Sequence, residues 1–295
     1  MSLASPKLRI RLTGLLALVT LVAPNCSKLG GSDSPTAPSG PPSPGSTIVY
    51  TAVGASDVTG EGSTKPCLPF EDCNGNGYVW VAARQLRGLG YTVNVFSLGI
   101  PTTVVSRAFA ELAVRYGRPV VSNMIEGELP FIDRTSTLIT IFAGANEVSA
   151  ITAALGGGAG GTNPTAFIDA QANSWAADFA TLVNGIRSRV PQARIIALNV
   201  PNVGALPSEA RDSIDQKRAA QRASVRMTAA VNATAGITIV DVMCDARFYQ
   251  PGSFSTDGLH PNDAGYAVLG AELARAVTSP SYPAPRTSCP QMTLF

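Results

Sequence analysis

The residues best suited to do chemistry lie close together near the C-terminus of the chain. His260 is the only histidine of the sequence, and Asp257 precedes it by three residues in the segment DGLHPND. Pro261 and the Asn262-Asp263 pair after it are typical of a helix start, so His260 is expected on a loop at a helix N-terminus. In such a turn the Asp257 carboxylate can reach Nδ1 of the imidazole and stabilise its protonated form. The pair is therefore suited to act as the base of a nucleophilic reaction.

The nucleophile that such a base would activate is expected at the end of the first strand. A β-rich run over residues 47–53 is followed at once by Gly54-Ala55-Ser56. Ligands gather at the carboxyl ends of strands in an open α/β sheet, and Gly54 permits the tight turn that would expose the Ser56 hydroxyl. A Gly-x-Ser tripeptide alone is a weak motif, and a serine in an ordinary turn is the alternative interpretation. No glycine stands two residues after Ser56, so this is not the G-x-S-x-G motif.

Two more strand ends carry groups that could stabilise negative charge developing on an oxygen atom. Gly99 follows the second predicted strand and offers a backbone N–H group. Asn146 follows the third predicted strand and offers a side-chain amide. Together with the backbone N–H of Ser56, these donors are the kind that an oxyanion hole requires. Each could instead be an ordinary turn residue, but four suitable groups at four segment ends favour one common site.

Alternating strands and helices position these residues. β-rich runs are predicted over residues 47–53, 92–98, 137–143, 193–199 and 237–242, and helical patterns over 78–89, 101–116, 165–189, 212–235 and 261–277. This alternation predicts a parallel sheet that is covered by helices on both faces. Pro101 is expected to open the helix over 101–116. Residues 58–77, 123–134 and 148–163 are expected to be loops that shape the pocket.

The four segments resemble the ordered blocks of the SGNH hydrolases, the superfamily of the GDSL-like lipases and esterases. Gly54-Ala55-Ser56 is similar to the GDS block and Gly99 to the block glycine, whereas Gly144-Ala145-Asn146 is similar to GxND and Asp257–His260 to DxxH. The resemblance covers residues 47 to about 277, and DGLHPNDAGY is its most specific part. It implies a flavodoxin-like three-layer α/β/α sandwich with a five-stranded parallel sheet. Ala55 and Glu147 stand where the family usually has Asp, at positions that do not carry its core chemistry.

The resemblance also implies an activity. The chain is expected to be a serine esterase that hydrolyses carboxylic esters with Ser56, His260 and Asp257 as its triad. The N–H groups of Ser56 and Gly99 and the amide of Asn146 would form the oxyanion hole, and neither a metal nor an organic cofactor is required. The substrate is expected to be a small-molecule, glycan or lipid ester. A carbohydrate O-deacetylase and a (lyso)phospholipase are the alternatives within the superfamily, and a catalytically inactive surface binding module is the non-enzymatic alternative.

Composition and charge limit the classes of partner. The chain of 295 residues has a formal net charge of +2, so no large electrostatic field points to nucleic acid. Hydrophobic residues make up 45% of it, which is enough to build the core of one medium-sized domain. We expect one α/β domain over residues 47–295 and a monomer.

The N-terminal residues predict export. Lys7, Arg9 and Arg11 precede an apolar run over residues 12–23, which is the order of charge and apolar residues in an export signal. We therefore assign residues 1–25 to such a signal. Cys26 follows it as in a bacterial lipoprotein, where the cysteine is lipidated, and ordinary signal cleavage is the alternative.

Residues 26–46 are rich in Pro, Gly and Ser and are expected to form a tether between the signal and the domain. The predicted location is the bacterial cell envelope or the medium outside the cell. An N-terminal lipid on Cys26 would then be the only attachment to the membrane.

The cysteine count agrees with export. Of five cysteines, Cys67, Cys73, Cys244 and Cys289 remain once Cys26 is set aside. An even number in an oxidising compartment suggests two disulfides, for which three pairings exist. We favour Cys67–Cys73, which would close a short loop, together with Cys244–Cys289, which would pin the C-terminal tail. The cysteine spacings do not match a zinc site.

Overall fold

The computed structural model describes residues 40–295. The expected export signal, the expected lipidation site Cys26 and residues 27–39 of the expected tether lie outside the described residues. The remainder of that tether lies against the domain, since the Arg194 guanidinium donates a 2.9 Å hydrogen bond to the Gly40 carbonyl and the Tyr91 hydroxyl donates one of 3.2 Å to the Pro42 carbonyl. None of the helices in residues 40–295 has both the length and the apolar composition that crossing a bilayer requires.

Five parallel strands form one sheet with the order β2-β1-β3-β4-β5. This is the strand order of flavodoxin-like folds, and it confirms the predicted fold class. The strands are β1 (Thr47–Gly54), β2 (Thr92–Ser97), β3 (Leu138–Phe142), β4 (Arg194–Leu198) and β5 (Thr238–Val240). Every residue of β3 is buried, as expected of a central strand covered on both faces, whereas alternate residues of the edge strand β2 are exposed.

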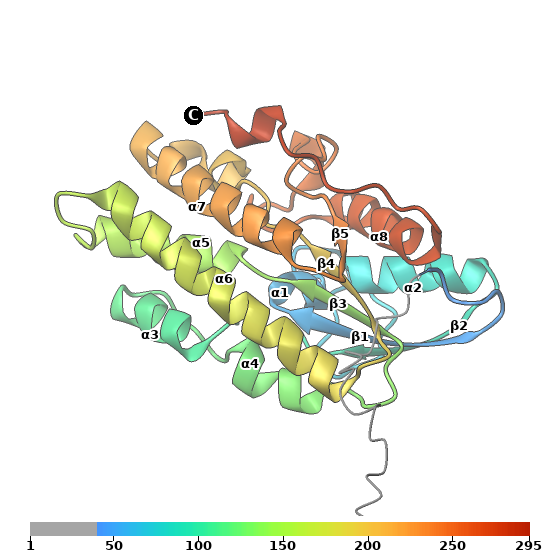
Figure 1. Cartoon of the computed structure of the whole chain (residues 1–295). Helices are drawn as coiled ribbons and strands as arrows, with labels where there is room; N and C mark the ends of the chain where they lie inside the picture. The colour runs from blue at the N-terminus through green and yellow to red at the C-terminus, as the bar shows by residue number, and fades with distance from the viewer. Residues whose placement is uncertain (1–39) are drawn as a thin grey trace, which may run out of the picture. The chain divides into compact units, whose positions relative to one another are not determined.

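Helices cover both faces of this sheet (Figure 1). Helices α2 and α8 pack against each other on one face, and α3 to α7 cover the other. The α-helices are α1 (Ser56–Thr59), α2 (Tyr78–Gly88), α3 (Arg107–Arg115), α4 (Met124–Gly127), α5 (Ala145–Gly156), α6 (Pro164–Arg189), α7 (Ile214–Ala233) and α8 (Asp263–Thr278). Short 3-10 turns occur at η1 (Leu129–Phe131), η2 (Val203–Ala205), η3 (Pro207–Arg211), η4 (Pro251–Ser253) and η5 (Pro290–Met292).

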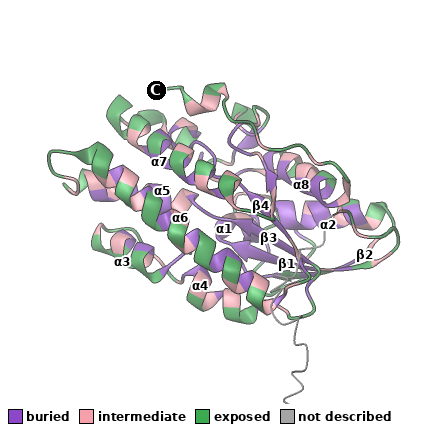
Figure 2. Cartoon of the chain, in the orientation of Figure 1, coloured by how far each residue is buried: buried purple, intermediate pink, exposed green. Residues whose placement is uncertain are grey.

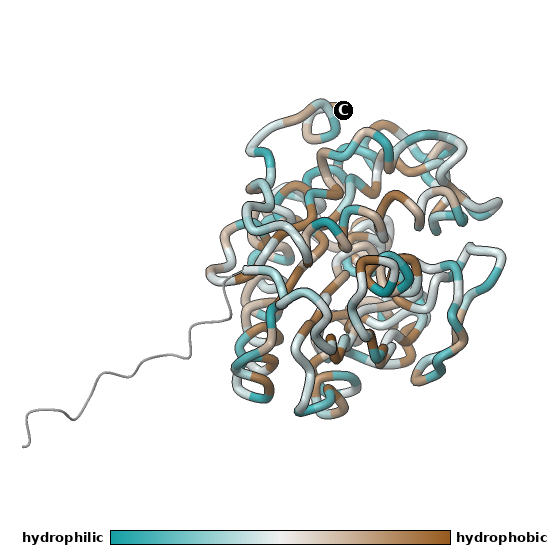
Figure 3. The backbone as a smooth tube through the Cα atoms, turned by 90° about the vertical axis from the view of Figure 1, so that its right-hand side faces the viewer, coloured by the Kyte–Doolittle hydropathy of each residue, from teal (hydrophilic) through white to brown (hydrophobic). Residues whose placement is uncertain are grey.

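The hydrophobic core lies on the two faces of the sheet. Buried positions follow the strands and the inward sides of the helices, while the outward sides of the helices are exposed (Figure 2). A view from the side shows hydrophobic stretches in the middle of the molecule and largely hydrophilic loops at its periphery (Figure 3). The carboxyl ends of the strands are therefore held by a packed scaffold, on which loop residues can be placed accurately.

Two predicted segments differ in the structure. The predicted helix over 101–116 begins only at Arg107, because Pro101 lies in a turn and Thr102 takes a left-handed φ of 68°. The β-branched Val104 then forms a parallel bridge with Asn123, which requires extended backbone. Conversely, most of the loop predicted over 148–163 belongs to α5, since no helix-breaking residue interrupts the chain before Gly156.

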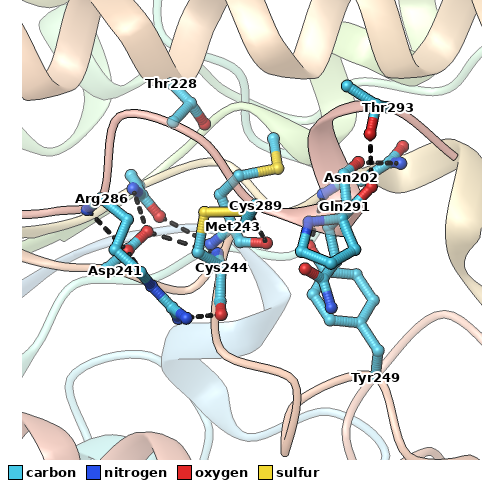
Figure 4. The surroundings of a disulfide bond; sticks show 12 residues. Asn202, Thr228, Asp241, Met243, Cys244, Tyr249, Arg286, Cys289, Gln291 and Thr293 are labelled. Carbon is cyan, nitrogen blue, oxygen red and sulfur yellow. Dashed lines mark hydrogen bonds and ion pairs between the residues drawn. A yellow bond between two sulfur atoms is a disulfide. The ribbon is translucent and has the colours of Figure 1, made fainter.

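Both favoured disulfides are present. Cys67–Cys73 closes a short loop between α1 and α2, and Cys244–Cys289 joins the segment after β5 to the C-terminal tail (Figure 4). Further contacts hold that tail, since the Arg286 side chain donates to the Asp241 carboxylate and to the Cys244 carbonyl. The Asn202 amide also donates a 2.8 Å hydrogen bond to the carbonyl of Gln291. Residues 286–291 are therefore part of the folded domain.

Candidate active site

Residues 255–262, here called the acid–base segment, form a compact turn before α8. The Ser255 N–H donates to the His260 carbonyl at 2.9 Å, and the side chain of Asn262 caps the first turn of α8. As predicted, His260 lies on the loop at a helix N-terminus. Its Nδ1 lies 2.6 Å from Oδ2 of Asp257, and its ring is mostly buried, with 17% of the side chain exposed.

The other carboxylate oxygen of Asp257 is saturated by local donors. Oδ1 accepts hydrogen bonds from the Ser255 hydroxyl at 2.7 Å and from the N–H groups of Leu259 at 2.8 Å and His260 at 2.9 Å. Burial alone would raise the pKa of Asp257, but hydrogen bonds from His260 and these donors lower it to about 2. The carboxylate is therefore ionised at neutral pH and can hold the imidazole in the tautomer that carries its proton on Nδ1.

Residues 54–57, here called the nucleophile turn, lead from β1 into α1. Gly54 has a φ of 152°, and a Cβ atom there would lie 2.4 Å from the Phe142 carbonyl oxygen, so only glycine fits between β1 and β3. Ser56 is the first residue of α1 and is 8% exposed. Its Oγ lies 2.8 Å from Nε2 of His260, across 204 positions of sequence. The structure thus brings the three predicted triad residues into one hydrogen-bonded chain.

The backbone of Gly99 lies directly against the nucleophile turn. A Cβ atom at Gly99 would lie 2.7 Å from the Ala55 carbonyl oxygen and 2.4 Å from Cβ of Val58. Neither the N–H of Gly99 nor that of Ser56 has a hydrogen-bond acceptor within residues 40–295. Both donors are therefore free to bind an oxygen atom of a ligand beside the Ser56 hydroxyl.

Asn146 lies in the first turn of α5, at the carboxyl end of β3. A hollow of about 20 Å³ is lined by this residue together with Ala55, Asp57 and residues 142–145 and 147. One N–H of the Asn146 amide donates to the Thr103 carbonyl at 2.9 Å. That bond fixes the side chain in place and leaves the second N–H of the amide for a ligand.

The structure also reveals two buried acids that the sequence analysis did not identify as parts of the site. Glu147, which follows Asn146, is fully buried and accepts a 2.5 Å hydrogen bond from the Val105 N–H. Burial raises its pKa to about 7, against the lowering effect of that bond. Glu128 is also fully buried, and its Oε2 accepts a 2.9 Å hydrogen bond from the Gly54 N–H. Glu147 lies in the third of the four sequence blocks, whereas no local sequence motif marks Glu128 as a support of the site.

The loop between α1 and α2 packs behind the acid–base segment. The Asp263 carboxylate accepts hydrogen bonds from the N–H and the hydroxyl of Thr64, at 2.8 and 2.6 Å, and the Tyr266 hydroxyl donates to the Glu61 carbonyl at 2.6 Å. These bonds connect the start of α8 to the chain that directly follows the nucleophile turn. Within residues 40–295, no group of three His, Cys, Asp or Glu side chains is placed to hold a metal ion.

Comparisons with known proteins place this geometry in context. The model of the GDSL-like lipase/acylhydrolase family matches residues 52–268. A lipase from a goat rumen metagenome has a similar structure, with a TM-score of 0.53 and 18% identity over 82% of this chain and 100% of the lipase. For an extracellular lipase from Streptomyces rimosus the TM-score is 0.52 and the identity 16%, over 79% of this chain and 100% of that one.

A third similar structure is a catalytic mutant of the acetylxylan esterase Axe2 from Geobacillus stearothermophilus. Its TM-score is 0.51, with 17% identity over 83% of this chain and 99% of that one. At these identities the structural matches show a shared fold. A search of curated protein sequences finds no match.

Proposed function

The chain belongs to the GDSL-like lipase/acylhydrolase family, and from this premise we propose that it is a serine esterase with Ser56, His260 and Asp257 as its triad. The observation that carries the proposal is the unbroken chain of short contacts, 2.8 Å from Ser56 Oγ to His260 Nε2 and 2.6 Å from His260 Nδ1 to Asp257 Oδ2. This arrangement gives the hydroxyl a proton acceptor and gives the resulting imidazolium a fixed counter-charge.

In the proposed reaction, His260 Nε2 takes the proton of Ser56 as Oγ attacks the ester carbonyl carbon. The carbonyl oxygen becomes an anion that the N–H groups of Ser56 and Gly99 and the amide of Asn146 would stabilise. The imidazolium then gives its proton to the departing alcohol, which leaves an acyl group on Ser56. A water molecule, activated by His260 in the same way, releases the carboxylic acid and restores the serine.

The hollow that Asn146, Ala55 and Asp57 line supports a short acyl group. The hollow next to the nucleophile turn has a volume of about 20 Å³, which leaves room for one or two groups of the size of a water molecule. A much larger groove of about 920 Å³ lies between α5, α6, α7 and the C-terminal tail, but no triad or oxyanion-hole residue lines it. We therefore favour acetyl esters, including those of carbohydrates, over the long-chain lipids of a (lyso)phospholipase.

The proposal is tested by hydrolysis of p-nitrophenyl acetate, butyrate and octanoate by the full chain and by its Ser56→Ala variant. We expect turnover to be fastest with acetate and to be lost in Ser56→Ala. Ser63→Ala is the matched control, because Ser63 lies in the neighbouring loop without a hydrogen-bond partner for its buried hydroxyl in the described part of the chain. A folded parent that hydrolyses none of these esters, nor acetylated xylan, would instead support a surface binding module.

We also propose that the protein acts outside the cytoplasm. Two disulfides in one domain support an oxidising compartment, because cytosolic thiols are generally kept reduced. The sequence pattern at Cys26 supports lipidation there. Metabolic labelling with an alkyne fatty acid tests this, since Cys26→Ala should abolish the label. Equal labelling of both chains would contradict lipidation at Cys26.

A further inference from the structure

We propose that Glu128 is a positioning residue for the nucleophile: its carboxyl group holds the backbone N–H of Gly54 and thereby sets the turn that presents Ser56 to His260. This inference rests on the proposed esterase function and adds to it a residue outside the triad and the oxyanion hole. Glu128 lies at the junction of α4 and η1, 74 positions along the chain from Gly54.

The hydrogen bond from Gly54 replaces a bond of the sheet. Beyond β2 the chain stays beside β1, since the N–H groups of Leu98 and Ile100 donate to the carbonyls of Ala52 and Gly54, at 2.9 and 3.3 Å. In a regular parallel ladder with this register, the Gly54 N–H would donate to the Leu98 carbonyl. It donates to Glu128 instead, at 2.9 Å. A side chain therefore ends the β1–β2 ladder at the residue where the chain turns toward Ser56.

Burial holds this acceptor in place and disfavours its charged form. Glu128 is 0% exposed, and none of the ion pairs within the described residues involves its carboxyl group. Burial raises the pKa of Glu128 well above its usual value, against a smaller lowering by the Gly54 N–H. A carboxyl group with one hydrogen bond, whose Oε1 has no partner in residues 40–295, is costly to bury. A leucine or methionine side chain would fill such a space without the free-energy cost of burying a polar group. The hydrogen bond to the Gly54 N–H therefore explains why a carboxyl group is present at this position.

The nucleophile turn offers few other means of adjustment. The contact between Gly54 and the Phe142 carbonyl prevents movement toward β3, and the contact between Gly99 and Ala55 prevents movement on the other side. Without the Glu128 carboxyl group, the Gly54 N–H would have to donate to a water molecule or to the Leu98 carbonyl. Either change would move Ser56 relative to His260. A displacement of about 1 Å in such a site can lower the rate by about a hundredfold.

The test compares Glu128→Ala and Glu128→Gln with the parent chain. Glutamine keeps an oxygen acceptor of the same reach without the ionisable group, whereas alanine removes the acceptor. Thr51→Val is the matched control, because it removes a buried 2.7 Å hydrogen bond between Thr51 and Ser136 elsewhere on β1. Each variant is checked for folding by thermal unfolding. The readouts are kcat and KM for p-nitrophenyl acetate and the rate at which a fluorophosphonate labels Ser56.

A further readout does not depend on activity. Because His260 is the only histidine of the sequence, histidine-selective isotope labelling gives one set of ring signals in the NMR spectrum, and these report its hydrogen bond to Ser56. Ser56→Ala provides the position of those signals when that bond is absent. Variants that merely unfold more easily keep the parental signals below their melting temperature.

We expect Glu128→Ala to lower kcat and the labelling rate about a hundredfold with KM within about twofold, and to move the His260 signals toward those of Ser56→Ala. Glu128→Gln and Thr51→Val should stay near the parent in all readouts. Parental kcat and His260 signals in a folded Glu128→Ala would overturn the proposal, and so would a Glu128→Gln variant as impaired as Glu128→Ala.

The same readouts separate this inference from the esterase function. A parent chain that neither hydrolyses esters nor is labelled contradicts the esterase function. In that case the NMR signals of His260 still test the positioning role of Glu128. Signals that move in both Ser56→Ala and Glu128→Ala support the positioning role even in that case, whereas signals unchanged in Glu128→Ala refute it.

Discussion

The two halves of the proposed triad are held in place by different means. In the acid–base segment, residues 255–262, nearly all hydrogen bonds to Asp257 and His260 come from within the segment, and 47% of the Asp257 side chain is exposed. In the nucleophile turn, residues 54–57, the supporting contacts come from Phe142, Gly99 and Glu128, each more than 40 positions away in sequence. The first half is shaped by its own sequence and the second by the fold.

This difference predicts how the two halves respond to substitution. Changes at Asp257 should reduce catalysis with little effect on folding, because 47% of its side chain is exposed and its hydrogen bonds are local. Changes around the nucleophile turn should affect both, because the same buried groups hold the sheet together. Four substitutions test this contrast.

The largest effect is expected for Asp257→Asn. The amide keeps an oxygen for the Leu259 and His260 N–H groups but cannot hold the imidazole as a carboxylate does, so kcat should fall by about 10⁴-fold. The melting temperature should change by no more than a few degrees. Kinetics with p-nitrophenyl acetate and calorimetry check both values. A large loss of stability would contradict the local character of this segment.

The next largest effect is expected for Asn146→Ala on the buried side of the site. Loss of one oxyanion donor should lower kcat by about 10²- to 10³-fold with a small change in KM. The side chain also holds the Thr103 carbonyl, so unlike Asp257→Asn this variant should lower the free energy of unfolding, by about 1 kcal/mol. Steady-state kinetics and urea unfolding measure the two effects. An unchanged kcat would remove Asn146 from the proposed oxyanion hole.

The third prediction concerns pH and Glu147. The folded-state pKa of about 7 lies above the ordinary value of 4.5, so between these pH values the folded chain holds a proton that the unfolded chain has lost. The contribution of Glu147 to the free energy of unfolding is fully present below pH 4.5. It falls by about 3 kcal/mol in total as the pH rises to 7. Glu147→Gln should therefore gain stability relative to the parent over that range. The free energy of unfolding is measured against pH for the parent chain and for Glu147→Gln, and parallel curves for the two proteins would contradict this prediction.

The smallest effect is expected for Ser255→Ala. It removes one of the local donors to Asp257 Oδ1 and leaves the two N–H groups in place. The pKa of Asp257 should rise from about 2 but stay well below 7, so kcat at neutral pH should fall by less than about tenfold. Steady-state kinetics at neutral pH measure this, and an effect as large as that of Asp257→Asn would show that the two N–H donors cannot compensate for the loss of the Ser255 hydroxyl.

The same contrast determines what could be predicted from the sequence. The turn that joins Asp257 to His260 before a helix could be predicted, because its helix start and the spacing of these two residues act over neighbouring positions, whereas the Ser255 hydroxyl that donates to Asp257 was not predicted. Ser56, Gly99 and Asn146 were placed correctly because parallel strands bring their carboxyl ends to one edge of the sheet. Their assignment as catalytic groups stays a prediction that the experiments above test.

Glu128 could not be predicted, because its role depends on a backbone N–H 74 positions away and no local pattern marks it. The bond from the Asn146 amide to the Thr103 carbonyl could not be predicted either, since it depends on the path of the chain after Gly99. The prediction of a helix from Pro101 was wrong, because proline favours both the start of a helix and a turn. The bridge between Val104 and Asn123 requires extended backbone there, which excludes the helix.

The disulfide between Cys244 and Cys289 has a consequence for the integrity of the domain. The bond encloses a span of 45 positions that contains Asp257, His260 and all of α8. A protease that cuts one peptide bond anywhere in this span produces two polypeptides that remain covalently joined, with the base still attached to the segment that follows β5. A cut there would leave the mass of the non-reduced protein changed only by one water molecule, while reduction would release the fragment. The disulfide thus keeps the more exposed half of the proposed triad attached to the domain after such a cut.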